Sequence, residues 1–135
     1  MTSGHVLGIG TDIVEIDRIR AILKRYPSKF LKRILTPYEQ KYCLERKEPA
    51  LHLAGRFAAK EAIVKAIGTG FSHGLSWTDI EICNDTYGKP SPFLSPFLLE
   101  KLGNDVQIQI SISHCKQYAT AFAICIKTDF YKPNL

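Results

Sequence analysis

Three stretches of the chain carry side chains that could do chemistry together. Asp12 follows a short apolar run, Glu61 stands between Lys60 and Lys65 in an alanine-rich run, and His114 follows an alternating run. Two carboxylates from separate elements are a typical way to hold Mg²⁺, which prefers oxygen ligands and keeps waters that a substrate phosphate can replace. Lysines beside such an ion neutralise phosphate oxygens, and a histidine can bond a phosphate or a reacting hydroxyl. These residue types therefore predict Mg²⁺-dependent phosphate chemistry.

Each of these side chains also has a simpler interpretation. Asp12 could cap the start of a helix. Glu61 and Lys65 could form an exposed pair one turn apart, which contributes only about 0.2–0.5 kcal/mol. No P-loop and no G-x-G-x-x-G motif is present, so the sequence excludes the common nucleotide-binding folds. The elements that position these residues decide between the two interpretations.

The stretch 56–70 predicts a helix, because it is rich in alanine, lacks proline and can be closed by Gly68 and Gly70. A solvated helix carries its charges opposite its apolar face. Here the charged side chains fall within or beside the apolar arc, and the opposite face holds small residues: Ala54, Ala58, Ala59, Ala62 and Ala66. We therefore expect the alanine face to pack closely on another element and the charges to point into a partly buried, polar place.

The first part of the chain predicts one strand and then helices. Val6–Ile9 is a short apolar strand in which Gly8 and Gly10 allow close approach of another backbone. Asp12 stands at the end of this strand, where the chain turns toward a helix over residues 13–26. That helix would bury its isoleucines, Ile13 included, and Pro27 would end it.

Two further helices precede the strands. Thr36, Pro37 and Glu39 form a capping box with proline in the first turn, which predicts a helix to about Glu45. After a break at residues 46–49, a long central helix covers about 50–67.

The second part of the chain is dominated by strand patterns. Residues 79–83 alternate well enough for a strand, and 84–90 form a turn by composition. Prolines delay any helix until 97–102. Residues 106–113 alternate strictly, and 118–127 would pair back on them as a hairpin. Helices early and strands late predict an α+β fold with a largely antiparallel sheet.

Composition places the chain among ordinary globular proteins. Its 135 residues predict one domain over 1–135, with 45% hydrophobic and 23% charged residues. No apolar run approaches the roughly 20 residues needed to cross a bilayer, and no signal peptide is apparent, so we expect a cytoplasmic location. The cysteines are widely spaced and lack a C-x-x-C pattern, which predicts reduced thiols rather than a zinc or redox site: Cys43, Cys83, Cys115 and Cys125.

The net charge of +5 is concentrated near the N-terminus. Residues 1–67 carry a net +6, whereas residues 68–135 carry a net −1. Between Arg18 and Arg33 there are seven basic residues and no acid. A solvated helix face usually includes compensating acids, so this segment predicts a surface for an anionic partner, whether nucleic acid, membrane or acidic protein.

The stretches that hold these residues resemble one known family in order, from Gly8 to about Ile126. They are similar to the motifs of holo-[acyl-carrier-protein] synthases, the short, single-domain type of 4'-phosphopantetheinyl transferase. The long paired blocks are the most specific part of the resemblance. The motifs are Gly8-Ile-Gly-Thr-Asp12-Ile-Val-Glu-Ile16, Arg56-Phe-Ala-Ala-Lys60-Glu61-Ala-Ile-Val-Lys65-Ala-Ile-Gly-Thr-Gly70, Asp79-Ile-Glu-Ile, Gly88-Lys-Pro90 and Ser111-Ile-Ser-His114.

The resemblance implies a reaction and a set of roles. The enzyme would move 4'-phosphopantetheine from coenzyme A to a serine of apo acyl carrier protein in fatty acid biosynthesis, releasing adenosine 3',5'-bisphosphate. Asp12 and Glu61 would hold Mg²⁺, and Lys65 would stabilise charge on the phosphates. Glu61 or a metal-bound water would deprotonate the serine. With Lys65, the residues implied in binding coenzyme A are Arg56, Lys60, Gly68, Gly70, Lys89, Pro90 and His114, and His114 would also take part in catalysis.

The resemblance also implies partners. Acyl carrier proteins are acidic and dock on the first helix in this family, where Arg18 and Arg25 are the matching positions. Family members form homotrimers whose sites lie between neighbouring subunits, with the nucleotide side and the basic helix from different chains. We expect the same assembly here.

Some positions depart from the family pattern. Residues 93–96 interrupt a region that is usually a longer helix, so that helix should be short. His73 stands where a basic residue is common, which would weaken one phosphate contact. Cys115 beside His114 is expected to be structural, and the tail 129–135 exceeds the pattern.

Two other functions compete with this interpretation. A nucleic-acid-binding module could use the basic helix, but it would need stacking aromatics or a known motif, and it would leave Asp12 and Glu61 unused. Another Mg²⁺-dependent phosphoryl or nucleotidyl transferase is the second alternative. We expect neither a nucleic-acid nor a membrane partner.

Overall fold

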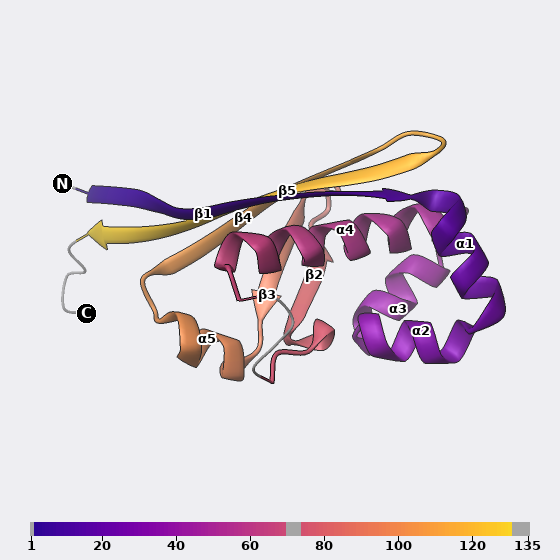
Figure 1. Cartoon of the computed structure of the whole chain (residues 1–135), viewed down its shortest axis with the longest axis horizontal. Helices are drawn as coiled ribbons and strands as arrows, with labels where there is room; N and C mark the ends of the chain where they lie inside the picture. The colour runs from indigo at the N-terminus through magenta and orange to yellow at the C-terminus, as the bar shows by residue number, and fades with distance from the viewer. Residues whose placement is uncertain (1, 70–73, 131–135) are drawn as a thin grey trace.

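A computed structural model of the chain describes residues 2–69 and 74–130. It is an α+β protein in which most helices precede most strands along the chain (Figure 1). A single 3₁₀ turn, Trp77–Asp79, precedes the second strand. In chain order the elements are β1 (Thr2–Glu15), α1 (Ile16–Arg25), α2 (Pro27–Ile34), α3 (Pro37–Leu44), α4 (Pro49–Ile67), β2 (Ile80–Asn84), β3 (Pro90–Leu94), α5 (Pro96–Leu102), β4 (Val106–His114) and β5 (Tyr118–Phe130).

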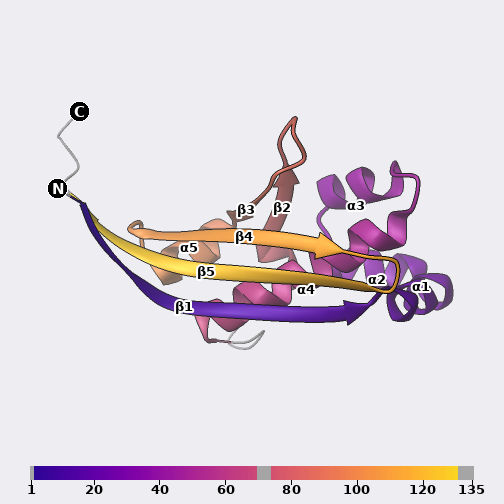
Figure 2. The same ribbon diagram turned by 90° about the horizontal axis from the view of Figure 1, so that it is seen from above.

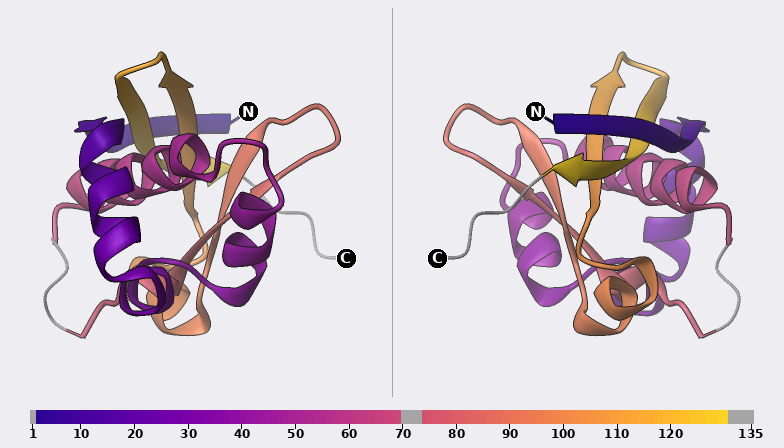
Figure 3. Two further views of the ribbon diagram at one scale, coloured as in Figure 1. Left: turned by 90° about the vertical axis from the view of Figure 1, so that its right-hand side faces the viewer. Right: turned by 90° about the vertical axis from the view of Figure 1, so that its left-hand side faces the viewer.

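The strands form two antiparallel sheets. The larger has the order β1-β5-β4, and the smaller pairs β2 with β3. Helix α4 runs beneath the larger sheet, with α1, α2 and α3 gathered at one end of the molecule and α5 toward the other (Figures 1 and 2). The β2–β3 hairpin reaches out on one side (Figure 3). No helix within residues 2–69 and 74–130 is long and apolar enough to cross a membrane.

The alanine face of α4 packs directly on β1, as predicted. A Cβ atom on Gly8 would overlap the carbonyl oxygen of Ala66, and one on Gly10 would overlap that of Ala62. The remaining alanines on this side of the helix are fully or almost fully buried. The strand and the helix therefore touch backbone to backbone, which fixes the strand residues that follow Gly10 relative to the helix.

The prediction that Asp12 ends a strand and starts a helix was wrong. Strand β1 continues to Glu15, with Asp12 opposite Ala121 of β5, because pairing with β5 extends over the whole segment. Ile13, predicted on the buried side of a helix, is 66% exposed on the outer face of the sheet. Helix α1 starts at Ile16 with Glu15 as its N-cap, so Asp12 does not cap it, and the Asp12 carbonyl oxygen instead accepts from Thr120 Oγ1 of β5.

Two elements were not predicted, and both involve proline. Pro27 ends α1 but also occupies the first turn of α2, a position where its missing N–H costs nothing. Pro90 and Pro92 lie in β3, which pairs with β2 alone, so these prolines occupy an edge strand that tolerates them. The capping box of α3, the central helix ending at Gly68 and the β4–β5 hairpin are confirmed.

Candidate functional site

Asp12, Glu61 and Lys65 meet at the contact between β1 and α4. The Lys65 Nζ donates to the Thr11 carbonyl oxygen at 2.9 Å and lies 3.3 Å from Asp12 Oδ1. Asp12 and Glu61 line the same cleft, together with Arg18 of α1. The backbone contact through Gly10 brings a strand carboxylate and a helix carboxylate to this cleft, which we call the carboxylate cleft. Its full lining is Asp12, Ile13, Val14, Glu15, Arg18, Phe57, Glu61 and Tyr118.

The carboxylate cleft disfavours an ionised Glu61. Burial raises the pKa of Glu61 above its usual value, and the Asp12 carboxylate raises it further, while Lys65 opposes the shift. Two carboxylates that repel each other in a partly buried place are a good donor set for a hard divalent cation. Within residues 2–69 and 74–130, no group of three or more His, Cys, Asp or Glu gathers to hold a metal by itself. A cation here would therefore leave positions for ligands from a substrate.

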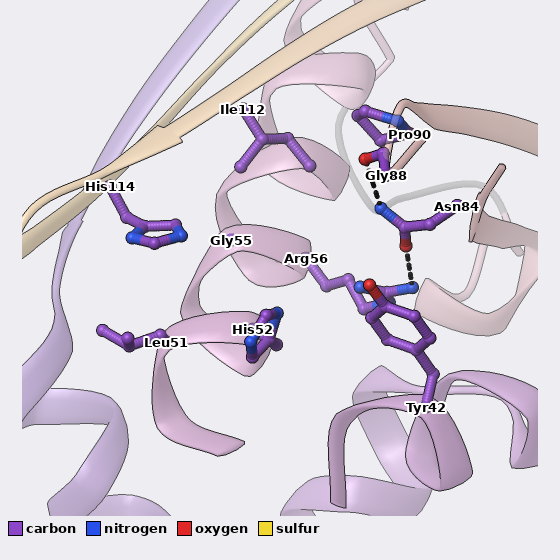
Figure 4. Close-up of a pocket in the computed structure, with 10 residues that line it drawn as sticks. All are labelled: Tyr42, Leu51, His52, Gly55, Arg56, Asn84, Gly88, Pro90, Ile112 and His114. Atoms are coloured by element: carbon purple, nitrogen blue, oxygen red, sulfur yellow. Dashed lines mark hydrogen bonds between the residues drawn. The ribbon is translucent and has the colours of Figure 1, made fainter. Parts of the chain in front are cut away.

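A second cavity lies between α3, α4, β2, β3 and the end of β4 (Figure 4). We call it the nucleotide pocket. It brings together three of the predicted coenzyme A residues, Arg56, Pro90 and His114. No acid lines it. The other lining residues are Tyr42, Leu51, His52, Gly55, Asn84, Gly88 and Ile112.

Arg56 is held firmly at the wall of the nucleotide pocket. Its Nη2 donates to the Ile82 carbonyl oxygen at 2.9 Å and to Asn84 Oδ1 at 2.8 Å, and its guanidinium lies 4.4 Å from the centre of the Tyr42 ring. Asn84 Nδ2 in turn donates to the Gly88 carbonyl oxygen at 3.0 Å. These bonds orient the guanidinium and tie the β2–β3 turn to the helix.

Lys60 is not in either site. Its side chain is 0% exposed, and its Nζ donates to Glu39 Oε1 at 2.6 Å and to the carbonyl oxygens of Ile34 and Trp77. Those three bonds use all three donors of an ammonium group. The structure therefore places Lys60 in the core as the partner of a buried carboxylate, and not facing the phosphates implied by the family resemblance.

The remaining predicted residues fall in different places. Arg18 lines the carboxylate cleft, whereas Arg25 is exposed at the end of α1 with its guanidinium 5.4 Å from the Tyr26 ring centre. Lys89 is exposed in the β2–β3 turn, next to Gly88 and Pro90 of the nucleotide pocket, without lining it. Gly68 ends α4 with φ of 90°. Gly70 and His73 lie outside the described residues.

Sequence reasoning missed Tyr42, His52 and Asn84 in the nucleotide pocket. Asn84 begins a predicted turn, and Tyr42 lies in a predicted helix, but nothing in their spacing places α3 beside β2. His52 lies one turn before Arg56 on the same helix. That spacing is the one sequence signal that could have identified it.

Comparison with known proteins agrees with the resemblance in sequence. Residues 8–123 match the model of the 4'-phosphopantetheinyl transferase superfamily. The chain is 63% identical over 118 residues to the holo-[acyl-carrier-protein] synthase of Protochlamydia amoebophila, covering 87% of this chain and 96% of that protein.

Solved structures give the same result. The holo-[acyl-carrier-protein] synthase of Neisseria meningitidis superimposes with a TM-score of 0.82 at 40% identity, over 90% of this chain and 98% of that one. The Helicobacter pylori synthase, solved in complex with coenzyme A, gives 0.78 at 36% identity, over 87% and 98%. With a family model matched over most of its length and a fold shared with these enzymes, the chain belongs to the 4'-phosphopantetheinyl transferase superfamily.

Proposed function

We propose that the chain is a holo-[acyl-carrier-protein] synthase of fatty acid biosynthesis. It transfers 4'-phosphopantetheine from coenzyme A to a serine of apo acyl carrier protein and releases adenosine 3',5'-bisphosphate. Relatives of this name cover nearly all of the chain. The observation that carries the proposal is that Asp12 and Glu61 line one cleft and that the Lys65 Nζ lies 3.3 Å from Asp12 Oδ1, since the pyrophosphate of coenzyme A needs charge neutralisation.

The transfer is a displacement at the β-phosphorus of coenzyme A. The serine Oγ forms the new P–O bond, and the bond from that phosphorus to the oxygen bridging to the α-phosphate breaks. The serine proton passes to an acceptor in the carboxylate cleft, where Glu61 is the carboxylate with the raised pKa. Lys65, whose side chain is 53% exposed, places its ammonium beside Asp12 to stabilise charge on the phosphate oxygens.

Mg²⁺ fits the donor set of the carboxylate cleft. Asp12 and Glu61 would hold it: burial and the Asp12 carboxylate raise the pKa of Glu61, and a cation between the two carboxylates would relieve their repulsion. When bound, the ion neutralises the pyrophosphate and lowers the barrier to displacement.

The nucleotide pocket would take the adenosine end of coenzyme A. Arg56 and His114 supply donors for a phosphate, and Gly88 and Pro90 form a wall against which a base can lie. Lys89, Gly68 and Gly70 are assigned to coenzyme A from the family resemblance.

The two sites border opposite sides of α4. Gly55 and Arg56 face the nucleotide pocket, while Phe57 and Glu61 face the carboxylate cleft, and a step of about 100° per residue sets these pairs on opposite sides of the helix. One molecule of coenzyme A would then engage the nucleotide pocket of one chain and the carboxylate cleft of another. This arrangement supports sites between subunits.

The outer face of the larger sheet supports a homotrimer. Ile9 and Ile13 of β1 are 61% and 66% exposed, and Phe122 of β5, which pairs with Thr11, is 39% exposed on the same face. The helices lie on the other side of the sheet (Figure 1). Exposed apolar side chains grouped on one sheet face favour burial against further copies of the chain.

The basic helix α1 would dock the acidic carrier protein next to the carboxylate cleft. Arg18 lines this cleft, and Arg25 lies two turns further along the same helix. All four cysteines are free thiols, which supports a reducing, cytoplasmic location.

The test is incubation of the chain with apo acyl carrier protein, coenzyme A and Mg²⁺. Mass spectrometry should show the carrier protein gaining one phosphopantetheine on its serine. Glu61→Ala should abolish transfer while circular dichroism shows an intact fold. An unmodified carrier protein would overturn the proposed function, and transfer at the natural rate by the variant would remove Glu61 from the site. Light scattering should give the mass of three chains.

A further inference from the structure

Two histidines from distant parts of the chain face each other in the nucleotide pocket. His52 lies on α4 and His114 ends β4, and their ring centres are 6.3 Å apart with 67° between the ring planes. Figure 4 shows His114 toward one side of the pocket and Arg56 toward the other, with His52 between them in this view. The two imidazoles and the guanidinium thus surround a common space.

Neither imidazole has a hydrogen-bond partner within residues 2–69 and 74–130. Each therefore keeps ring nitrogens that can bind a ligand. His52 also packs against Tyr42, with ring centres 6.0 Å apart, so its ring is oriented by a neighbour that takes none of its nitrogens. An oriented imidazole without a partner at a pocket wall is a ready donor.

The charges around His52 favour an anion. Burial, then His114, then Arg56 and Arg46 lower the pKa of His52 below its usual value. The same groups would hold a bound anion. Two acids lie near these groups: Glu39, whose Oε2 is 3.5 Å from Arg56 Nε, and Glu48, which lines an adjoining cavity with His114. The titratable and charged groups facing the two rings are Tyr42, Arg46 and Arg56 around His52, and Arg20, Glu48, Cys115 and Lys116 beside His114.

We infer that His52 is a specificity residue that, with His114 and Arg56, binds the 3'-phosphate of coenzyme A. Coenzyme A carries its pyrophosphate at the bond that breaks and one separate phosphate monoester on the ribose. If the pyrophosphate lies at Asp12 and Glu61, the monoester is the anion left for a pocket with an arginine and two histidines. This inference rests on the proposed function.

A dianion between the rings opposes the burial and the positive neighbours that lower the pKa of His52. When the phosphate binds, the protonated imidazole becomes the favoured form, so binding takes up a proton. A rise of one unit in the pKa of His52 on binding equals a tenfold gain in affinity at acidic pH. Affinity that depends on His52 should therefore grow as the pH falls.

The test compares the natural chain with His52→Gln, which keeps a donor but cannot be protonated. Affinity for adenosine 3',5'-bisphosphate is measured by calorimetry at about pH 8 and about pH 6. At each pH, the affinity of the natural chain is divided by the affinity of His52→Gln. The ionisation of the ligand affects both proteins alike and cancels in this ratio. We expect this ratio to grow roughly tenfold toward pH 6. His5→Gln, the same change on the exposed face of β1, should leave the ratio at one.

Dephospho-coenzyme A, which lacks the 3'-phosphate, should show a ratio that does not change with pH. A ratio that stays constant for the bisphosphate would overturn the inference, as would equal growth for both ligands. A second measurement needs no variant: in NMR titrations of the natural chain, the pKa of His52 should rise when the bisphosphate binds. Successful transfer with a constant ratio would refute only the role of His52. Bisphosphate binding without transfer would refute only the proposed function.

Discussion

Gly10 and Ala62 are in direct backbone contact, since the space that a Cβ atom on Gly10 would need is filled by the carbonyl oxygen of Ala62. This contact joins β1 to α4 two residues before Asp12 and one residue after the position of Glu61. The two carboxylates of the cleft are thus placed by backbone packing rather than by loops.

Gly10→Ala should destabilise the chain by about 3 kcal/mol, because neither backbone can yield without separating the strand from the helix. Urea unfolding at fixed protein concentration measures this loss. Gly4→Ala is the matched control on the same strand: its Cβ would lie 3.3 Å from the Lys127 carbonyl oxygen, so its cost should be much smaller. Equal losses at the two glycines would contradict the special role of Gly10.

Lys60→Met should cost about 3 kcal/mol in the free energy of unfolding, because it leaves the Glu39 carboxylate buried without its main partner. Calorimetric affinity of the folded variant for coenzyme A should stay within about threefold of the natural value, since Lys60 reaches neither site. Lys65→Met on the exposed side of the same helix should do the reverse, with slow transfer and little loss of stability. A large loss of coenzyme A affinity in Lys60→Met would instead indicate that Lys60 binds the phosphates of coenzyme A.

Glu61→Gln should raise the melting temperature of the chain without Mg²⁺ at neutral pH. The pKa of Glu61 is raised in the folded state, so the folded chain holds the proton more tightly, and stability falls as pH rises from the ordinary pKa through the raised one. A neutral amide removes that cost.

Mg²⁺ should stabilise the natural chain, by about 2.7 kcal/mol when its concentration is 100 times its dissociation constant. The variant should lose this response, while Glu45→Gln at the exposed end of α3 should keep it. A full Mg²⁺ response in Glu61→Gln would exclude the carboxylate cleft as the cation site. Differential scanning fluorimetry with and without Mg²⁺ gives both results.

Arg18→Glu combined with Arg25→Glu should raise KM for carrier protein at least about tenfold and weaken its dependence on salt. Steady-state kinetics with carrier protein as the varied substrate measures this. Coenzyme A affinity should be unchanged. The pair Lys41→Glu and Lys47→Glu makes the same change of net charge at exposed positions outside α1. If that pair raised KM equally, net charge rather than α1 would attract the carrier protein.

The packing of α4 could be predicted because it depends on residue size. Glycines in β1 and alanines on one helix face are visible in the sequence, and the structure joins them. The length of β1 could not be predicted in this way. Asp12 and Ile13 follow Thr11 with no break in pairing, and only the presence of β5 alongside makes this polar segment a strand.

The carboxylate cleft was predicted more fully than the nucleotide pocket. Asp12, Glu61 and Lys65 needed only one strand and one helix to meet. The role of Lys60 could not be predicted because its partner Glu39 has the sequence position of a capping residue. The Glu39 carboxylate accepts both from the Thr36 N–H at the start of α3 and from the Lys60 ammonium. A local motif cannot show that the same side chain is also 0% exposed and reaches across to β2.

The bonds of Glu39 determine how α3, α4 and β2 can unfold. Its Oε1 accepts from Lys60 of α4 and its Oε2 accepts from the backbone N–H of Ile82 in β2, while the residue itself belongs to α3. If α3 or α4 detached alone, an unpaired charge would remain inside the core, and if β2 detached alone, the buried Glu39 carboxylate would lose the Ile82 donor. They must therefore unfold as one cooperative unit, and the amide of Ile82 should exchange its hydrogen only in that event. Tyr42, Arg56 and Asn84 belong to the same three elements, so the nucleotide pocket keeps its shape before a ligand arrives.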